Sequence, residues 1–198
     1  MQIKNIFTIL LIAISFIACK QANLKYDKPY FDFDSLITSQ IQKQMSNKDS
    51  IYKVAMIDSK QDHSLFLIDS TRLAHEWDVF RQLDVINKPL YKGNYEITEG
   101  KDTKSNLQVR TYQSKIKSPI PFVRFYFHDD FKNLKKIESN YQEENALYFT
   151  KRDLMMALDD LSGELLIKDY SITGSQKMIL SDSVRFSIKG SIGAKVDN

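Results

Sequence analysis

Apolar side chains in two parts of the chain recur at helical spacing. Between residues 33 and 45, and again between 73 and 83, they stand three or four positions apart. This spacing places them on one face of an α-helix. Asp34 or Ser35 can cap the first helix and Asp69-Ser70 the second, because these short side chains accept hydrogen bonds from the free N–H groups of a first turn. We therefore expect two one-faced helices.

A third segment carries the signals of a helix start and a helix end. Thr150 to Asp153 resembles a capping box, with Asp in place of the usual Glu. The apolar residues that follow at helical spacing are Leu154, Ala157, Leu158 and Leu161. Gly163 stands where a helix would close. This pattern predicts a third helix over 154–161.

The other apolar positions form short runs, most of which alternate with polar residues at the period of a β-strand. The runs are 52–57, 65–68, 95–98, 107–112, 122–128, 134–141, 146–149, 165–172, 178–180 and 184–188. Val123 and Phe125 share one face of their run, which leaves Arg124 and Tyr126 on the other. Polar or glycine-containing turns connect the runs.

The connections between these runs, among them 58–64 and 173–175, are too short for the crossovers that parallel strands need. Sequential hairpins are therefore expected. The predicted fold is α+β: a single domain over 32–198, in which about three helices pack on an antiparallel, meander-like β-sheet. A signal-peptide helix and a short tether precede it.

The first 18 residues have the pattern of a signal peptide. One cation, Lys4, precedes the apolar or small run 6–16, and Ile17-Ala18-Cys19 follows. At about 1.5 Å per residue, this run covers only about half of a roughly 30 Å hydrocarbon layer. We therefore predict a cleaved signal peptide over 1–18 and no permanent span there.

The segment Phe16-Ile17-Ala18-Cys19 resembles the lipobox of bacterial lipoproteins, although Phe16 stands where Leu is usual. In that family the cysteine receives a diacylglycerol thioether, signal peptidase II exposes it, and its amino group is then acylated, often with palmitate. The resemblance implies cleavage between Ala18 and Cys19, and lipidation of Cys19. Residues 19–31 would then be the lipidated N-terminus and tether.

The predicted anchor implies a place in the cell envelope, because two or more acyl chains hold a protein stably on a membrane. Lys20 follows the cysteine, and residues 20–23 contain no acidic cluster. By analogy with lipoproteins that lack an inner-membrane retention residue, we expect the outer membrane rather than the inner one.

Composition removes several classes of function. The chain has 28 Lys and Arg against 25 Asp and Glu, and a formal net charge of +3. Acids and bases are interleaved, so we expect no nucleic-acid partner. The one cysteine is Cys19. Once it is lipidated, the mature domain can form no disulfide, thiolate metal site or cysteine nucleophile.

The candidate chemistry is sparse. His63, His75 and His128 each stand beside acids, but none has the spacing of a metal-binding or general-base motif. Asp129-Asp130 and Glu143-Glu144 lack the spacing of a calcium loop. The glycines form neither a phosphate-binding loop nor a nucleophile elbow. We therefore predict no catalytic residue, no cofactor and no metal site.

Three functions remain open, and they are ranked from the most to the least favoured. The first is a non-enzymatic envelope lipoprotein that binds a protein partner or serves assembly. The second is a carrier of lipid or another apolar ligand, by analogy of fold alone with carriers of the LolA and LolB type. The third is an envelope hydrolase. If the domain is a carrier, the strand faces of Tyr112, Phe122 or Tyr126 should look into a cavity. If it is not, the helix that contains Trp77 should cover these faces.

Overall fold

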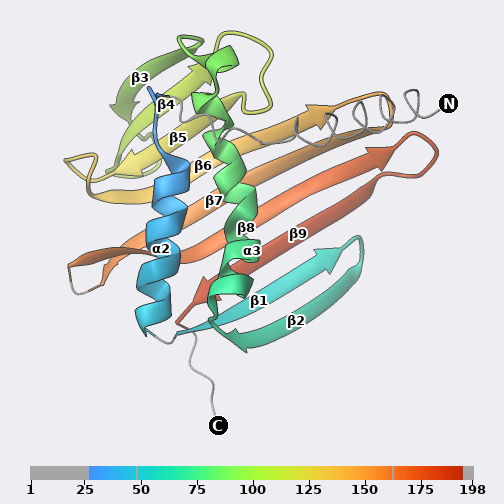
Figure 1. Ribbon diagram of the computed structural model, residues 1–198, viewed down its shortest axis with the longest axis horizontal. Coiled ribbons are helices and arrows are strands. Elements are labelled where there is room, and N and C mark those ends of the chain that lie inside the picture. Colours follow the sequence, from blue (N-terminus) through green and yellow to red (C-terminus); the bar gives the residue numbers. More distant parts are fainter. Residues whose placement is uncertain (1–26, 48, 162, 194–198) are drawn as a thin grey trace, which may run out of the picture.

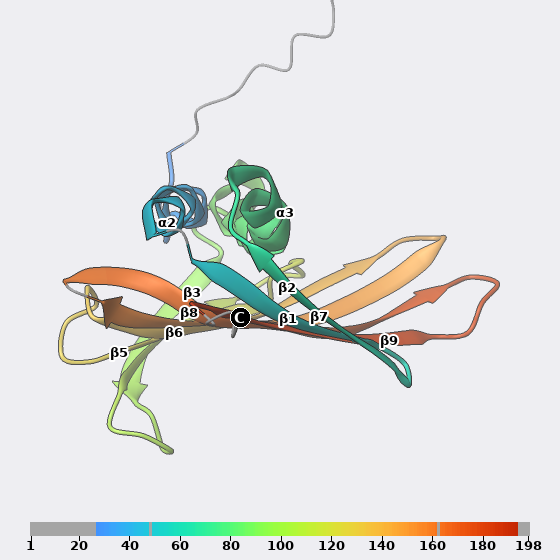
Figure 2. The same ribbon diagram turned by 90° about the horizontal axis from the view of Figure 1, so that it is seen from below.

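The computed structural model describes residues 27–47, 49–161 and 163–193 of the chain. The expected signal peptide, its cleavage site at Ala18 and Cys19, and the first part of the tether lie outside the described residues. The described part is a single domain in which one large β-sheet carries helices on one of its faces (Figures 1 and 2).

The sheet has nine strands in the order β2-β1-β9-β8-β7-β6-β5-β4-β3, and every pair is antiparallel. The strands are β1 Ser50–Ile57, β2 Lys60–Leu67, β3 Tyr95–Lys101, β4 Gln108–Ser114, β5 Phe122–Phe127, β6 Leu134–Glu144, β7 Tyr148–Leu161, β8 Glu164–Met178 and β9 Val184–Ile192. Strands β3 to β9 form a continuous meander. The hairpin of β1 and β2 then joins the sheet beside β9.

Two α-helices, α2 Phe33–Asn47 and α3 Ser70–Arg81, lie on the same face of the sheet (Figure 2). Two short 3₁₀ helices, η1 Gln82–Asn87 and η2 Pro89–Tyr91, continue from α3. Both expected helices are confirmed, and Asp69 caps α3 by accepting a 2.9 Å hydrogen bond from the Arg72 N–H. At α2, Asp32 takes the capping role expected of Asp34 or Ser35, since its carboxylate accepts from the Ser35 N–H.

The expected third helix is wrong, because residues 148–161 form strand β7. The described residues of the domain therefore form two α-helices where about three were expected. Leu154, Met156 and Leu158 are all buried on one face, at the period of a strand. Strands β6 and β8 pair along both sides of β7, which favours the extended form. Gly163 closes the hairpin of β7 and β8 with a φ of +84°, a conformation that glycine adopts without strain.

Three connections also differ from those expected. The turn of the first hairpin is short, because β2 begins at Lys60 and includes most of 58–64. Residues 173–175 lie inside β8, where a side chain at Gly174 would collide with the backbone of β7. Glycine there marks a close approach of two strands. Residues 179 and 180, expected as part of a strand, lie in the turn after β8.

The core fills the layer between the helices and the sheet. Trp77 and Phe80 of α3, Phe33 of α2, and Phe125 and Met156 of the sheet are each 0% exposed. These side chains form one cluster with apolar residues of most strands. Full burial of such side chains contributes about 1.5 to 3 kcal/mol each, so this layer is the main source of stability.

The end of the expected tether is part of the packed domain. The Tyr30 ring lies 5.3 Å from the Tyr95 ring and 5.8 Å from the Tyr112 ring, measured between centroids. Phe31 packs against Phe125 at 4.8 Å. Lys28 forms an ion pair with Asp84 at 3.0 Å. The packed part of the chain therefore begins before residue 32.

Helix α2 also serves as a hydrogen-bonding partner for β8. Strand β8 begins at Glu164, but its pairing with β9 begins only at Asp169. Before Asp169, β8 pairs with β7 on one side but has no strand on the other. On that open side the Gln40 side chain accepts from the Ile167 N–H and donates to the Leu165 carbonyl, each at 2.8 Å. Gln44 donates to the Ile167 carbonyl at 2.8 Å. Two glutamines thus satisfy backbone groups that a neighbouring strand would otherwise pair.

Candidate functional site

The first uncovered surface is a polar hollow on the helix-free face of the sheet. The hairpin of β3 and β4 curves out on that side (Figure 2). Together with β5 and β6 it encloses a hollow of about 740 Å³. Its lining residues are Thr98, Glu99, Gly100, Lys101, Asp102, Thr103, Lys104, Ser105, Leu107, Val109, Thr111, Arg124, Tyr126, Lys136 and Glu138.

The acids near the centre of this hollow are already paired. Glu138 accepts a 2.7 Å hydrogen bond from the Tyr126 hydroxyl and forms a 2.9 Å ion pair with Lys136. The Lys136 ammonium also lies 3.9 Å from the centroid of the Tyr126 ring. Asp102 accepts from the Ser105 hydroxyl at 2.7 Å.

These contacts determine the protonation states of Glu138 and Tyr126, which form the floor of the hollow. Burial opposes ionisation of Glu138, but the hydrogen bonds from Lys136 and Tyr126 outweigh it and lower the pKa of Glu138. Burial, together with the bond to Glu138, raises the pKa of Tyr126 to about 12. At neutral pH Glu138 is therefore a carboxylate and Tyr126 a neutral phenol.

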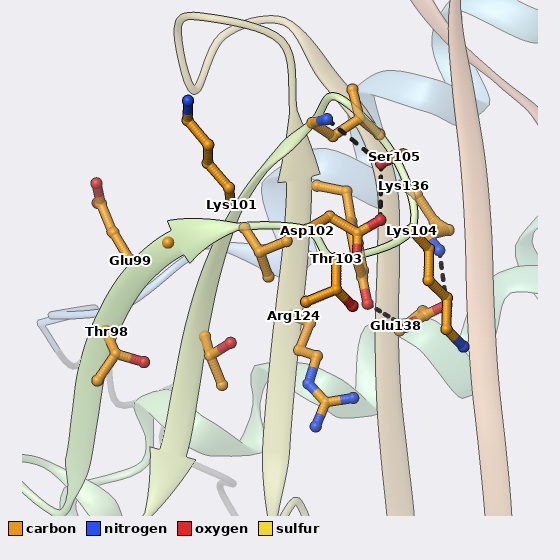
Figure 3. A pocket seen from close by; sticks show the side chains of 15 residues that line it. Thr98, Glu99, Lys101, Asp102, Thr103, Lys104, Ser105, Arg124, Lys136 and Glu138 are labelled. Carbon is orange, nitrogen blue, oxygen red and sulfur yellow. Dashed lines mark hydrogen bonds and ion pairs between the residues drawn. The ribbon is translucent and has the colours of Figure 1, made fainter.

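Two cations at the hollow form no close ion pair in the described part of the chain, although each acts on an acid there. Arg124 stands opposite Glu138 on the neighbouring strand and its charge helps to lower the pKa of Glu138, as Lys104 does for Asp102. The Arg124 guanidinium lies 4.6 Å from the Phe122 ring centroid. In Figure 3 these two side chains lie on opposite sides of Glu138, and Lys101 points away from it. The hollow thus combines occupied acceptors with free donors.

The second uncovered surface is the end of the sheet that projects beyond the helices. Three turns lie at this end, β1 to β2, β6 to β7, and β8 to β9 (right side of Figure 1), and their tips diverge in the view of Figure 2. Among the described residues, these turns and the adjoining strand ends carry eight of the fifteen exposed large apolar side chains. They are Met56, Ile57, Leu147, Phe149, Met178, Ile179, Leu180 and Val184. We call this group the projecting apolar end.

Backbone pairing links the three turns of the projecting apolar end, where Ile57, Met178 and Val184 lie on the helix side of the sheet and Met56 and Phe149 on the other side. The Ile179 N–H donates to the Leu147 carbonyl at 2.9 Å, which joins the turn after β8 to the turn after β6. Ile57 pairs in register with Phe186 of β9, which joins β1 to the same end. Leu180 is 95% exposed, and Ile179 is 68% exposed. Large apolar patches of this kind mark interaction sites on proteins.

The three histidines do not converge. His63 is on β2, the first strand of the sheet, whereas His128 follows β5, the seventh. Six strand spacings of about 4.8 Å separate these strands by about 29 Å. His75 lies exposed on α3. Each of the other two has a local partner: His63 contacts the Tyr52 hydroxyl at 2.9 Å, and His128 contacts Asp129 at 2.7 Å.

Other sequence candidates have structural roles. Trp77 is part of the core, as its helical spacing predicts. Glu143 accepts hydrogen bonds from the Tyr141 and Tyr148 hydroxyls, and Glu144 lies 3.7 Å from the Lys117 ammonium. Over the described ranges, no group of three or more His, Cys, Asp or Glu side chains is placed to hold a metal ion.

Comparison with known proteins gives no family. No protein-family model matches the chain, and neither the curated proteins nor the solved structures contain a significant match. The assignment of a function therefore depends on the geometry of the domain and on the residues around Cys19.

The strand faces that could distinguish a carrier point in opposite directions. Tyr112 is 6% exposed and packs against Tyr30 and Phe125 on the helix side. Tyr126 faces the polar hollow on the other side.

Within 27–193, apart from the two gaps, no helix combines the length and the apolar character needed to cross a bilayer.

Sequence reasoning found part of the hollow and missed the projecting apolar end. Strict alternation in 122–128 placed Arg124 and Tyr126 together, opposite the core face. The position of Lys104 depends on the curvature of a hairpin, for which the sequence has no local signal. The run Met178 to Leu180 was interpreted as a strand because it is apolar.

Proposed function

We propose that this chain is a lipid-anchored envelope lipoprotein whose domain is a non-enzymatic docking module for a protein partner. The observation that carries the docking role is the projecting apolar end, where eight large apolar side chains are 40% to 95% exposed. The anchor rests on the resemblance of residues 16–19 to a lipobox. The outer membrane is the proposed location.

Charges on the three turns favour a protein partner over a bilayer. Acids and bases both lie at this end: Asp58, Glu144 and Asp182 at or beside the turns, and Lys60, Lys177 and Arg185 on the adjoining strands. The hydrocarbon layer would strip both kinds of charge of water at high cost. A protein can place a group of opposite charge or a hydrogen-bonding group opposite each of them. The partner should therefore offer an apolar cleft with a rim that carries charges of both signs.

The carrier alternative has less support in the described residues. A LolA-like or LolB-like carrier would hold its ligand in an apolar space beneath the helices. Here Trp77, Phe80 and Leu73 of α3 are each 0% exposed against the sheet. The envelope hydrolase alternative also has little support, because the three histidines lie on separate elements of the fold.

The docking role is tested by pull-down from detergent-solubilised membranes with the full chain. The test variant is Ile179→Ser with Leu180→Ser, and the matched control is Leu90→Ser, since Leu90 is 71% exposed but lies on η2. We expect the wild type and the control to retain one reproducible partner and the test variant to lose it. Equal recovery by all three proteins would contradict the proposed docking surface.

The anchor is tested separately with Cys19→Ala. Intact mass and membrane fractionation should show an acyl-sized increase and membrane retention in the wild type, and neither in the variant. A wild type that is released without added mass would contradict the proposed lipoprotein.

A further inference from the structure

The polar hollow is lined by more bases than acids. Its three acids are occupied: Glu138 by Lys136 and Tyr126, Asp102 by Ser105, and Glu99 by Arg110. Arg124 and Lys104, by contrast, form no ion pair within the described part of the chain. The free hydrogen-bonding capacity of the hollow is therefore mainly that of donors, which suits an anion.

We propose that the hollow under the β3–β4 hairpin binds a phosphate monoester carried on a small polar body. A phosphate monoester has a charge of about −1.5 to −2 at pH 7, which suits Arg124 and Lys104, two cations without a close ion pair, better than the single charge of a carboxylate does. The planar guanidinium of Arg124 can donate two parallel hydrogen bonds to two phosphate oxygens. Lys104 supplies the second positive charge from the hairpin.

The position of Arg124 is prepared by its neighbours. Its guanidinium lies 4.6 Å from the Phe122 ring centroid, two residues before it on the same face of β5. A guanidinium over a ring loses less freedom when it binds than one that is fully mobile. Lys136 neutralises Glu138, so the carboxylate on the floor opposes an approaching anion only weakly.

The size and lining of the hollow define the rest of the ligand. About 740 Å³ is far more than one phosphate needs and lies within the range of small-molecule sites. Three threonines, Thr98, Thr103 and Thr111, line it, whereas its aliphatic lining is limited to Leu107 and Val109. This lining favours a hydroxylated body such as glycerol or a sugar over an acyl chain.

The phosphate could come from a free ester or from a lipid headgroup, and the test separates these sources. The full chain, purified in a nonionic detergent, is titrated with glycerol 3-phosphate and with dihexanoyl phosphatidic acid by isothermal calorimetry. Glycerate, which carries one carboxylate on a similar hydroxylated body, serves as the carboxylate probe. This site does not depend on the proposed docking role, so the two can fail separately.

The variants are chosen so that charge and folding can be distinguished. Arg124→Gln removes the cation, Arg124→Lys keeps the charge but not the planar fork, and Lys104→Gln removes the second cation. Arg185→Gln is the matched control, because Arg185 is exposed on β9 and does not line the hollow. Thermal unfolding of each variant checks that the fold is retained.

The wild type should bind glycerol 3-phosphate saturably, and Arg124→Gln should weaken binding about tenfold or more, as expected for a lost charge-assisted pair. Arg124→Lys should restore part of the loss, and Arg185→Gln should change nothing. Binding of both phosphate probes supports the shared chemistry, and binding of one identifies the source. The proposal is overturned if no probe saturates, if glycerate binds as tightly as the phosphates, or if folded Arg124→Gln binds like the wild type.

Discussion

The helix side of the sheet has a covered part and a projecting part, both built largely from the same strands. Under the helices, Met156 and Tyr170 are at most 1% exposed. Farther along the strands, Met178 is 53% and Val184 is 42% exposed. The residue types are similar in the two parts. What differs is the presence of a helix above them.

The dimensions of the elements explain this difference. Strand β8 has 15 residues, which span about 50 Å at about 3.3 Å per residue. The two helices cross the strands steeply (Figure 1), so their combined width, about 20 Å at about 10 Å per helix, sets the covered length of each strand. The helix layer is therefore too narrow to cover the whole length of the strands. Apolar residues at the uncovered end are available to a partner.

The largest expected effect is the loss of a core side chain from the covered part. Trp77→Ala should lower the free energy of unfolding by about 3 to 5 kcal/mol, because it leaves a large cavity at a fully buried site. Leu180→Ala, at the projecting end, should change it by less than about 0.5 kcal/mol. Urea unfolding measures both. A comparable loss in both variants would mean that the two parts of the face are equally packed.

A second test concerns the close contact between Gly190 of strand β9 and the Tyr170 ring beneath the helices. At Gly190 an added methyl group would meet the Tyr170 ring, so Gly190→Ala should cost about 1 to 3 kcal/mol of unfolding free energy. Gly100 lies on the β3–β4 hairpin, outside the covered part, and a methyl group added there would have no atom within 4 Å. Gly100→Ala should therefore be tolerated. If Gly190→Ala were equally mild, Tyr170 would be less tightly held than the covered part requires.

The smallest expected effect is electrostatic and belongs to the helix-free face. Because the pKa of Glu138 is lowered in the folded protein, its ionised form stabilises the fold above its unfolded pKa of about 4.3. This contribution disappears as the pH falls through the folded pKa. Glu138→Gln should therefore lose less than about 1 kcal/mol at pH 7, since the site is partly exposed.

The difference between Glu138→Gln and the wild type should disappear in acid. Chemical unfolding at pH 7 and below pH 4 measures this change. A difference that stays constant across the titration would show that Glu138 acts through packing and not through its charge.

The two helices could be predicted from sequence because each has one apolar stripe and a short polar residue near its start, although the cap of α2 is Asp32 and not Asp34 or Ser35. Asp69 caps α3, and Trp77 and Phe80 of its stripe are buried. Residues 154–161 carry two patterns at once: Leu154, Ala157 and Leu158 fit a helix, whereas Leu154, Met156 and Leu158 fit a strand. The pairing of β7 with strands on both sides decides between them, and this pairing is not local.

The candidate surfaces were only partly predictable, for a related reason. Alternation along β5 placed Arg124 and Tyr126 on the face away from the core. The nearby position of Lys104 depends on how the β3–β4 hairpin curves. The exposure of Leu180 depends on where the helices end above the sheet. Both are properties of the assembled domain that no short window of sequence contains.

The most direct test of the docking role is photo-crosslinking in intact cells, with a photoreactive amino acid placed in turn at Leu180 and at Leu90 of the full chain. Both positions are highly exposed, at 95% and 71%. We predict one discrete protein adduct from position 180 and none of the same mass from position 90. Adducts to lipid alone from position 180, or the same protein adduct from both positions, would contradict a protein-docking role for the projecting apolar end.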